Sequence, residues 1–202
     1  LEICRFWASK SVLDESNGRY NISKVMGPDE FHEEHKASKG GGVKNNAYTN
    51  IMVAWLFVKA FEILDKLPEK SKKIIISKIN LVPDEIKEWS GISKNLNIPI
   101  SEEGIIEQFE GYFDLKELDW DAYREKYPNI YRLDRILKAE GKSPDDYKLA
   151  KQADTLMTFY NLDEGDVRSL VKNPDFELPL DYLKKNYNYY LNRTSHGSTL
   201  SR

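Results

Sequence analysis

The chain contains one cysteine, Cys4, in 202 residues. A single cysteine excludes an internal disulfide and is typical of proteins from a reducing compartment, so we expect a cytoplasmic location. An excess of one charge is also missing, because 30 basic and 33 acidic side chains give a formal net charge of −3. No block of like charge is long enough to form a nucleic-acid-binding arm, so nucleic acid is not an expected partner.

Long hydrophobic runs are absent as well. The densest apolar stretch, residues 51–58, ends at Lys59, well short of the roughly 20 residues that span a bilayer, so we expect no membrane segment. Hydrophobic residues still make up 40% of the chain, which is enough for a folded core. Residues 1–10 have the apolar spacing of a helix without an initial methionine, and residues 195–202 resemble a loop entering a helix. We therefore expect one domain or a piece of a larger one.

Helical periodicity dominates the segments that are present. The clearest helix is predicted at 50–67, with a wide apolar face closed by Pro68. Ser143-Pro-Asp-Asp146 places a cap residue, a proline and two acids ahead of 147–160, which predicts that a long helix begins there. Further helices are predicted at 71–80, 84–96, 119–127, 130–140, 164–172 and 179–191. Short extended pieces are predicted near 20–26 and 98–100, and the fold class is all-α with long inter-helix loops.

Four polar and aromatic stretches interrupt the helical pattern, at 27–33, 108–114, 151–154 and 196–199. Loops that connect helices are where binding and catalytic residues are concentrated. Each stretch also has a plain structural interpretation: an exposed acidic turn, a set of core aromatics, a solvated helix face and a helix cap. Spacing alone does not decide between these interpretations.

The motifs in and around these stretches resemble glycoside hydrolase family 65, which contains inverting phosphorylases of maltose, trehalose, kojibiose and nigerose. The resemblance rests on five blocks in the same order: Gly-Pro-Asp-Glu-Phe-His at 27–32, Asn-Asn-Ala-Tyr-Thr-Asn at 45–50, Phe-Glu-Gly-Tyr-Phe-Asp-Leu at 109–115, Lys-Gln-Ala-Asp at 151–154 and His-Gly-Ser-Thr-Leu-Ser at 196–201.

The resemblance implies that residues 1–202 are the later part of an (α/α)6 barrel of the six-hairpin glycosidase type. The family's N-terminal β-sandwich and earlier barrel helices would then lie outside this chain, and we expect the full-length protein to form a homodimer. The family's earlier Trp-Asp pair, which contacts the glucosyl unit, has no counterpart here. A part of the sugar site is therefore expected to be missing from these residues.

The candidate general acid is Glu30. Cleavage of a glycosidic bond with inversion needs an acid that protonates the leaving oxygen and a nucleophile on the opposite face of the sugar. Glu30 follows Asp29 in a turn fixed by Gly27 and Pro28, and burial or the neighbouring carboxylate is expected to keep it protonated near neutral pH. The resemblance implies the same role, because the family's general acid is the glutamate of this block.

The candidate phosphate site is formed by His196, Gly197, Ser198 and Thr199. These residues offer hydroxyls and backbone N–H groups ahead of an expected helix start, an arrangement suited to an anion. No Asp or Glu follows Asp181, which mildly favours phosphorolysis over hydrolysis. A carboxylate from elsewhere in the fold leaves hydrolysis open, and in either case we expect no cofactor beyond inorganic phosphate as a co-substrate.

Candidate sugar-binding residues are Lys151 and Gln152, which resemble the family's pair that hydrogen-bonds the glucosyl hydroxyls and are expected to lie inside the helix that starts near 143. Glu110 and Tyr112 are expected to line the same cavity. No metal site is expected, because His32 and His35 are spaced i,i+3 where the zinc-protease pattern requires i,i+4.

The sequence therefore predicts an enzyme that phosphorolyses an α-glucosidic disaccharide to β-glucose 1-phosphate and a free acceptor sugar. A hydrolase of the same disaccharides on the same scaffold is one alternative. A second is a non-catalytic piece, since half of a helical barrel leaves apolar faces uncovered.

Overall fold

The computed structural model describes residues 1–38, 40–171 and 177–197. In this part of the chain, nine α-helices, two short 3-10 helices and one two-stranded hairpin are joined by long loops. In chain order the elements are α1 (Glu2–Lys10), β1 (Ser11–Asp14), β2 (Arg19–Ile22), α2 (Ala47–Lys66), α3 (Glu69–Lys78), α4 (Pro83–Asn95), η1 (Tyr112–Asp114), α5 (Trp120–Lys126), α6 (Leu133–Ala139), η2 (Pro144–Asp146), α7 (Asp154–Asn161), α8 (Glu164–Leu170) and α9 (Tyr182–Leu191).

Helix α2 is the central element of the larger core. Its N-cap Asn46 accepts a hydrogen bond from the Thr49 backbone N–H, and Pro68 follows shortly after its last residue. By length and composition α2 resembles a membrane span, but eight of its residues are buried within this chain, where it packs against α1, α4, α7 and α8. Burial of these apolar side chains makes α2 a core helix of this fold.

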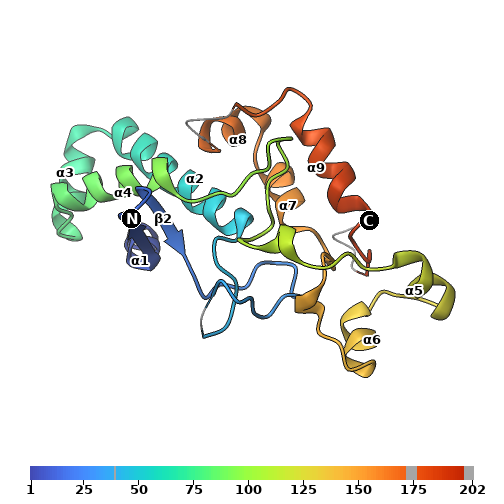
Figure 1. The fold of residues 1–202 in the computed structure, drawn as a ribbon. Helices are drawn as coiled ribbons and strands as arrows, with labels where there is room; N and C mark the ends of the chain where they lie inside the picture. Colours follow the sequence, from blue (N-terminus) through green and yellow to red (C-terminus); the bar gives the residue numbers. More distant parts are fainter. Residues whose placement is uncertain (39, 172–176, 198–202) are drawn as a thin grey trace.

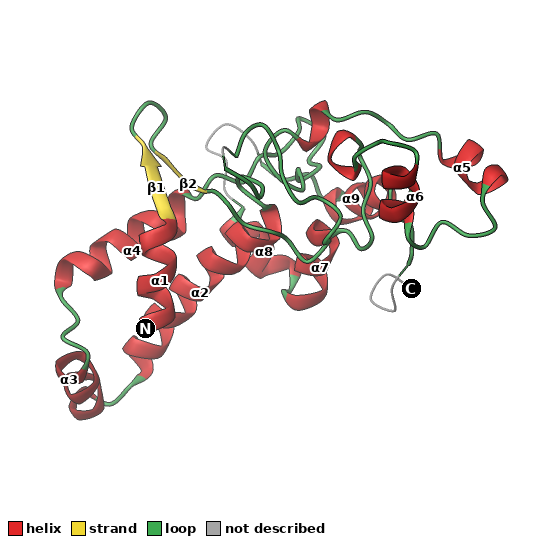
Figure 2. Ribbon diagram, turned by 90° about the horizontal axis from the view of Figure 1, so that it is seen from below, coloured by secondary structure: helices red, strands yellow, loops and turns green. Residues whose placement is uncertain are grey.

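A second, smaller core lies at the opposite end of the molecule from α3 (Figures 1 and 2). Helices α5 and α6 contribute three of its seven buried side chains, the loops around them contribute others, and Phe31 packs with them from a distant part of the sequence. The members of this smaller core are Phe31, Leu118, Tyr123, Ile130, Leu133, Leu137 and Leu149. The loop that contains Glu30 is therefore anchored on the α5–α6 region by the side chain that follows it.

Strands β1 and β2 form an antiparallel hairpin in which Ser11 pairs with Ile22 and Asp14 with Arg19. The prediction of an extended piece near 20–26 is confirmed for β2, whereas the strand at 11–14 was not predicted. Asn17-Gly18 between the strands is a turn signal, and Gly18 has the positive φ of +69° that such a turn requires.

Most of the predicted helices are found within a few residues of their expected bounds, but the long helix expected from Ser143 is wrong. Ser143 does cap the backbone, accepting from the Asp145 N–H, yet only the short η2 follows and α7 begins at Asp154. The intervening backbone bonds to other segments: the Lys148 N–H donates to Lys116 and the Ala150 N–H donates to Arg193. These tertiary hydrogen bonds replace the helical ones that local sequence favours.

Candidate active site

Three segments that are far apart in the sequence, at 27–30, 150–152 and 193–196, meet near the start of α7. The Ala150 carbonyl accepts from the Ser195 N–H at 2.8 Å, so the segment that leads to His196 runs beside Lys151. The Gln152 side chain donates to the Pro28 carbonyl, which attaches the same segment to the turn that contains Glu30. The structure thus brings Glu30, Lys151, Gln152 and His196 into one region, as the sequence predicted for residues of one site.

Glu30 lies on the surface of this region. Its φ of +64° is in the left-handed range that non-glycine residues rarely adopt. Its carboxylate accepts from the Lys151 Nζ at 2.8 Å, and 63% of its side chain is exposed. The burial that the sequence argument invoked for this carboxyl is therefore not present in this chain. Instead, the neighbouring Asp29 is the buried carboxyl, with 2% of the residue exposed.

The Asp29 carboxylate is surrounded by hydrogen-bond donors. Its Oδ1 accepts from the Lys151 backbone N–H at 2.6 Å, and its Oδ2 is 3.5 Å from the Gln108 Nε2. The same Oδ2 is 3.0 Å from the His32 Nδ1, and the other ring nitrogen of His32, Nε2, is 3.0 Å from the Tyr147 carbonyl oxygen. A carbonyl only accepts, so Nε2 is the donor in the contact with Tyr147, and the His32 ring bridges this carbonyl and the Asp29 carboxylate.

Asp154, the first residue of α7, lies behind this turn. Its Oδ2 accepts from the Asn46 Nδ2 at 2.8 Å, which links the N-termini of α2 and α7. Burial, and then the nearby charge of Asp29, raise the pKa of the Asp154 carboxyl well above its usual range. A Cβ on Gly27 would lie 1.8 Å from this Oδ2, so glycine is required for the turn to pack here.

Gln152 is buried in a bend of the loop before α7 rather than on a helix, which corrects the sequence prediction for this residue and for Lys151. Within the part of the chain that the structure describes, the Gln152 Oε1 has no hydrogen-bond partner, and neither do the Gln108 Oε1 and the Asp154 Oδ1. Buried oxygens without partners are uncommon and tend to mark functional sites. Here the three oxygens belong to residues that lie against the turn at 27–30.

The candidate phosphate site is only partly within the described residues. His196 has a φ of +53°, and a Cβ on Gly197 would lie 2.2 Å from the Tyr131 carbonyl oxygen. The close approach explains the glycine and places this loop against the segment between α5 and α6. Ser198 and Thr199, together with the helix expected after them, lie outside the described residues.

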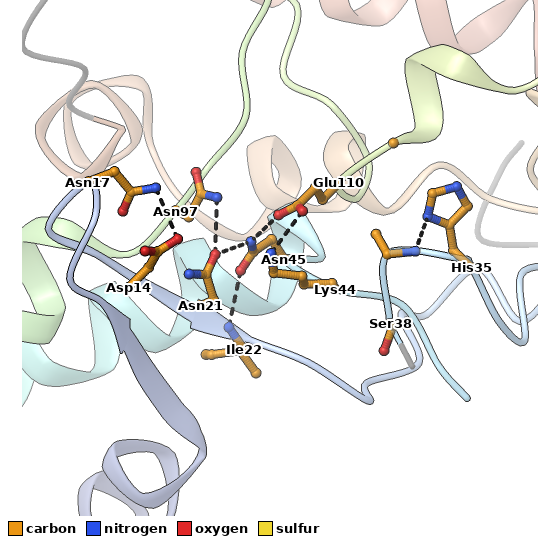
Figure 3. Close-up of polar contacts among 12 residues, drawn as sticks. Asp14, Asn17, Asn21, Ile22, His35, Ser38, Lys44, Asn45, Asn97 and Glu110 are labelled. Atoms are coloured by element: carbon orange, nitrogen blue, oxygen red, sulfur yellow. Dashed lines mark hydrogen bonds and ion pairs between the residues drawn. The ribbon is translucent and has the colours of Figure 1, made fainter. Parts of the chain in front are cut away.

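Glu110 belongs to a separate polar cluster. Its carboxylate accepts from the Lys44 Nζ at 2.8 Å and from the Asn45 Nδ2 at 2.7 Å. Figure 3 shows that Asn45 lies between Glu110 and Asn21, whose side chain it also contacts. Both oxygens of Glu110 are thus engaged by residues outside the 27–30 turn, and its role toward a sugar stays a prediction.

Tyr112 is fully buried rather than lining a cavity. Its ring packs against Phe109, Phe113 and Tyr190, which is the core position that the sequence left open as the alternative. Burial raises the pKa of its hydroxyl well above the usual range. In this chain, the Tyr112 ring cannot stack on a sugar, because neighbouring side chains cover it.

Sequence reasoning missed Asp29, Gln108 and Asp154 as parts of the site, and treated His32 only as a rejected metal ligand. The first three lie inside or beside the quoted motif blocks, so their position was available as a signal. Their buried contacts with one another depend on the tertiary fold.

Comparison with known proteins gives a consistent result. The model of the glycosyl hydrolase family 65 central catalytic domain matches residues 1–202. A trehalose 6-phosphate phosphorylase from Lactococcus lactis subsp. lactis is 46% identical, over 100% of this chain and 25% of its own length. A kojibiose phosphorylase from Caldanaerobacter subterraneus subsp. tengcongensis is 35% identical, over 100% of this chain and 24% of its own length.

Among solved structures, one described as a "Putative kojibiose phosphorylase from human microbiome" superposes with a TM-score of 0.71 at 26% identity, covering 99% of this chain and 26% of that chain. The chain thus spans about a quarter of the length of these relatives. It belongs to glycosyl hydrolase family 65, and its helices are part of the all-α (α/α)6 barrel of that family's catalytic domain.

Proposed function

We propose that the protein containing this chain phosphorolyses an α-glucosidic disaccharide to β-glucose 1-phosphate and a free acceptor sugar. Phosphorylases of disaccharides are among its relatives in the family. In the proposed reaction a phosphate oxygen forms a bond to the anomeric carbon as the glycosidic C–O bond breaks. The proton of Glu30 goes to the leaving oxygen, and the configuration at the anomeric carbon inverts.

The observation that supports this proposal most strongly is the 2.8 Å contact between the Glu30 carboxylate and the Lys151 Nζ. It joins the candidate acid to a candidate sugar-binding residue across 121 positions of sequence. The segment at 193–195 is hydrogen-bonded to Ala150 next to them, so the His196 loop starts beside the same pair. An acid, a hydroxyl-binding cation and an anion-binding loop are the groups that the reaction requires.

Among possible substrates, trehalose 6-phosphate is the first to test. The chain is 46% identical to a trehalose 6-phosphate phosphorylase, against 35% to a kojibiose phosphorylase. A panel for the full-length protein is trehalose 6-phosphate, trehalose, kojibiose, maltose and nigerose, each with inorganic phosphate. Release of β-glucose 1-phosphate from one member at a much higher rate than from the others identifies the substrate.

Product analysis separates phosphorolysis from hydrolysis. With the best substrate, we expect β-glucose 1-phosphate to form at a rate that depends on the phosphate concentration, with little free glucose from the cleaved glucosyl unit. A hydrolase releases that unit as free glucose at the same rate with and without phosphate. The second result would refute the proposed reaction while leaving the scaffold and the family assignment intact.

The phosphate site is tested by substituting Ser198 and Thr199 with alanine in the full-length protein. If hydroxyls of this stretch bind phosphate, the KM for phosphate rises much more than the KM for the disaccharide, because the sugar is held elsewhere. A simple helix cap predicts instead a loss of about 1 kcal/mol in stability with phosphate use unchanged. An equal rise in both KM values would also contradict the assignment.

A further inference from the structure

We propose that Asp29 is a positioning residue that fixes Lys151 and Glu30 relative to each other. This role rests on the proposed function of those two residues. Its carboxylate lies directly beneath the Glu30–Lys151 pair without being exposed itself. It acts on the substrate only through Lys151 and the turn at 27–30.

The first argument is that Asp29 fixes one end of Lys151 while Glu30 contacts the other. The Lys151 backbone N–H donates to the Asp29 Oδ1 at 2.6 Å, and the Lys151 Nζ donates to the Glu30 Oε2 at 2.8 Å. Because Asp29 and Glu30 are consecutive residues, the two bonds close a small loop between segments 121 positions apart. Only 23% of the Lys151 side chain is exposed, so its direction is restricted as well.

The second argument is that the Asp29 carboxylate is itself held rigidly. His32 and Gln108 approach its Oδ2, and His32 is fixed on its far side by the Tyr147 carbonyl. The side chains of Asp29 and His32 are each 3% exposed, so water does not compete for these bonds. A buried carboxylate with several donors is a fixed reference point, because breaking any of these bonds leaves a buried polar group unpaired.

The third argument is the backbone of the turn. Glu30 has a φ of +64°, a conformation that costs a non-glycine residue about 1–2 kcal/mol. Such strain persists only where the surroundings impose it. Here Gln152 donates to the Pro28 carbonyl and Asp29 accepts from the Lys151 N–H, so two of the bonds that hold the turn come from consecutive residues of one loop.

The test uses the full-length enzyme and compares Asp29→Ala, Asp29→Asn and Asn186→Ala with the wild type. In Asp29→Ala the Lys151 backbone is released, so we expect kcat to fall about 10²-fold and the KM for the disaccharide to rise about tenfold. The KM for phosphate should stay unchanged, because the anion is bound by a different loop. Rates are normalised to the folded fraction, which is measured by circular dichroism and by thermal melting.

The conservative variant Asp29→Asn should recover most of both losses. Its Oδ1 can accept from the Lys151 N–H, and its Nδ2 can donate to the His32 Nδ1 in the tautomer that carries the ring proton on Nε2. Asn186 is the matched structural control. It is fully buried and makes three hydrogen bonds, accepting from the Ile106 N–H and donating to the carbonyls of Gly104 and Tyr182. Asn186→Ala should lower the melting temperature and leave both KM values unchanged.

The proposal is overturned if Asp29→Ala behaves like Asn186→Ala, if it raises both KM values equally, or if Asp29→Asn recovers nothing. If Asp29→Ala does not fold, Asp29→Ser replaces it with the same expected result, because a serine hydroxyl is too short to reach the Lys151 N–H. The comparison is made for whichever cleavage the wild type performs. A wild type that hydrolyses would refute the proposed phosphorolysis, and this test would then be decided by kcat, by the KM for the disaccharide and by the recovery in Asp29→Asn.

Discussion

Two buried polar clusters of this molecule differ in charge and in how completely they are paired. The asparagine cluster consists of Asn21, Asn45, Asn50, Asn97 and Glu110, and the aspartate cluster consists of Asp29, His32, Gln108, Gln152 and Asp154. In the asparagine cluster, amide groups bond to one another, and of its fully buried polar atoms only the Asn50 Oδ1 is without a partner among the described residues. The aspartate cluster holds two carboxyls and an imidazole, and three of its oxygens have no partner in the same part of the chain.

The difference indicates that the two clusters have different roles, one in stability and one in function. A network made mostly of neutral amides joins loops at little electrostatic cost, and its one carboxylate, Glu110, is partly exposed and paired with Lys44. Here the network attaches β2 and the 97–110 segment to the start of α2. Buried ionisable groups with unpaired oxygens are costly for folding alone and are typical of sites that act on a ligand. The aspartate cluster lies next to Glu30, the candidate general acid. A cost in folding stability is expected at such a site.

The largest effect on stability is expected from Gly27→Ala. A Cβ at this position would lie 1.8 Å from the Asp154 Oδ2 and 2.5 Å from the Asn46 Nδ2, so α7 and the turn must move apart. We expect a loss of about 3–5 kcal/mol in the free energy of unfolding, measured by urea denaturation. The control is Gly91→Ala in α4, whose Cβ would meet nothing closer than 3.5 Å and which should gain about 0.5–1 kcal/mol. Equal effects of the two substitutions would show that the aspartate cluster is loosely packed.

A smaller effect is expected from Asn45→Ala in the asparagine cluster. Its side chain donates to Asn21 and Glu110 and accepts from the Ile22 N–H and from Asn50. Loss of these bonds should cost about 2–3 kcal/mol of stability, because buried partners are left unpaired. The turnover of the folded enzyme should stay near the wild-type value. A stable variant with greatly reduced turnover would mean that this cluster also belongs to the catalytic site.

The smallest expected effect, taken over a single pH unit, is a change in the pH dependence of stability in Asp154→Asn. The pKa of Asp154 is raised in the folded protein, so above the unfolded-state pKa the native state retains a proton that the unfolded state has lost. The stability of the wild type therefore falls as pH rises, by about 1.4 kcal/mol per pH unit until the native pKa is reached. Asparagine does not titrate, so the variant should gain stability over the wild type between about pH 5 and pH 7. If the free energy of unfolding depends on pH in the same way in both proteins, Asp154 is ionised in the folded wild type, which would contradict the prediction.

Sequence periodicity predicted the helices because their apolar faces repeat locally, as in α2 and α4. It failed at 147–153, where the backbone bonds to Lys116 and Arg193 and an irregular loop replaces the expected helix. Local propensity cannot reveal such pairing, since the partner residues lie about 30 to 45 positions away along the chain. The hairpin at 11–22 was missed although Asn17-Gly18 signals it.

The site residues were predicted from the family resemblance more than from physical reasoning. Glu30, Lys151 and His196 come together as the motif blocks indicated, but the expected burial falls on Asp29 and the ring of Tyr112 lies in the core. The residues that support the site, including Asp29 and Asp154, carry no pattern of their own. Their role follows only from which segments the fold brings into contact.

The most direct test of the central claim, that Glu30 is the general acid, compares two substrates in Glu30→Gln of the full-length enzyme. The first is the disaccharide and the second is α-glucosyl fluoride, each with phosphate. Fluoride leaves with little need of protonation, so the account predicts a fall of about 10²–10⁴-fold for the disaccharide and a far smaller fall for the fluoride. An equal fall for both substrates, or a disaccharide rate close to that of the wild type, would contradict it.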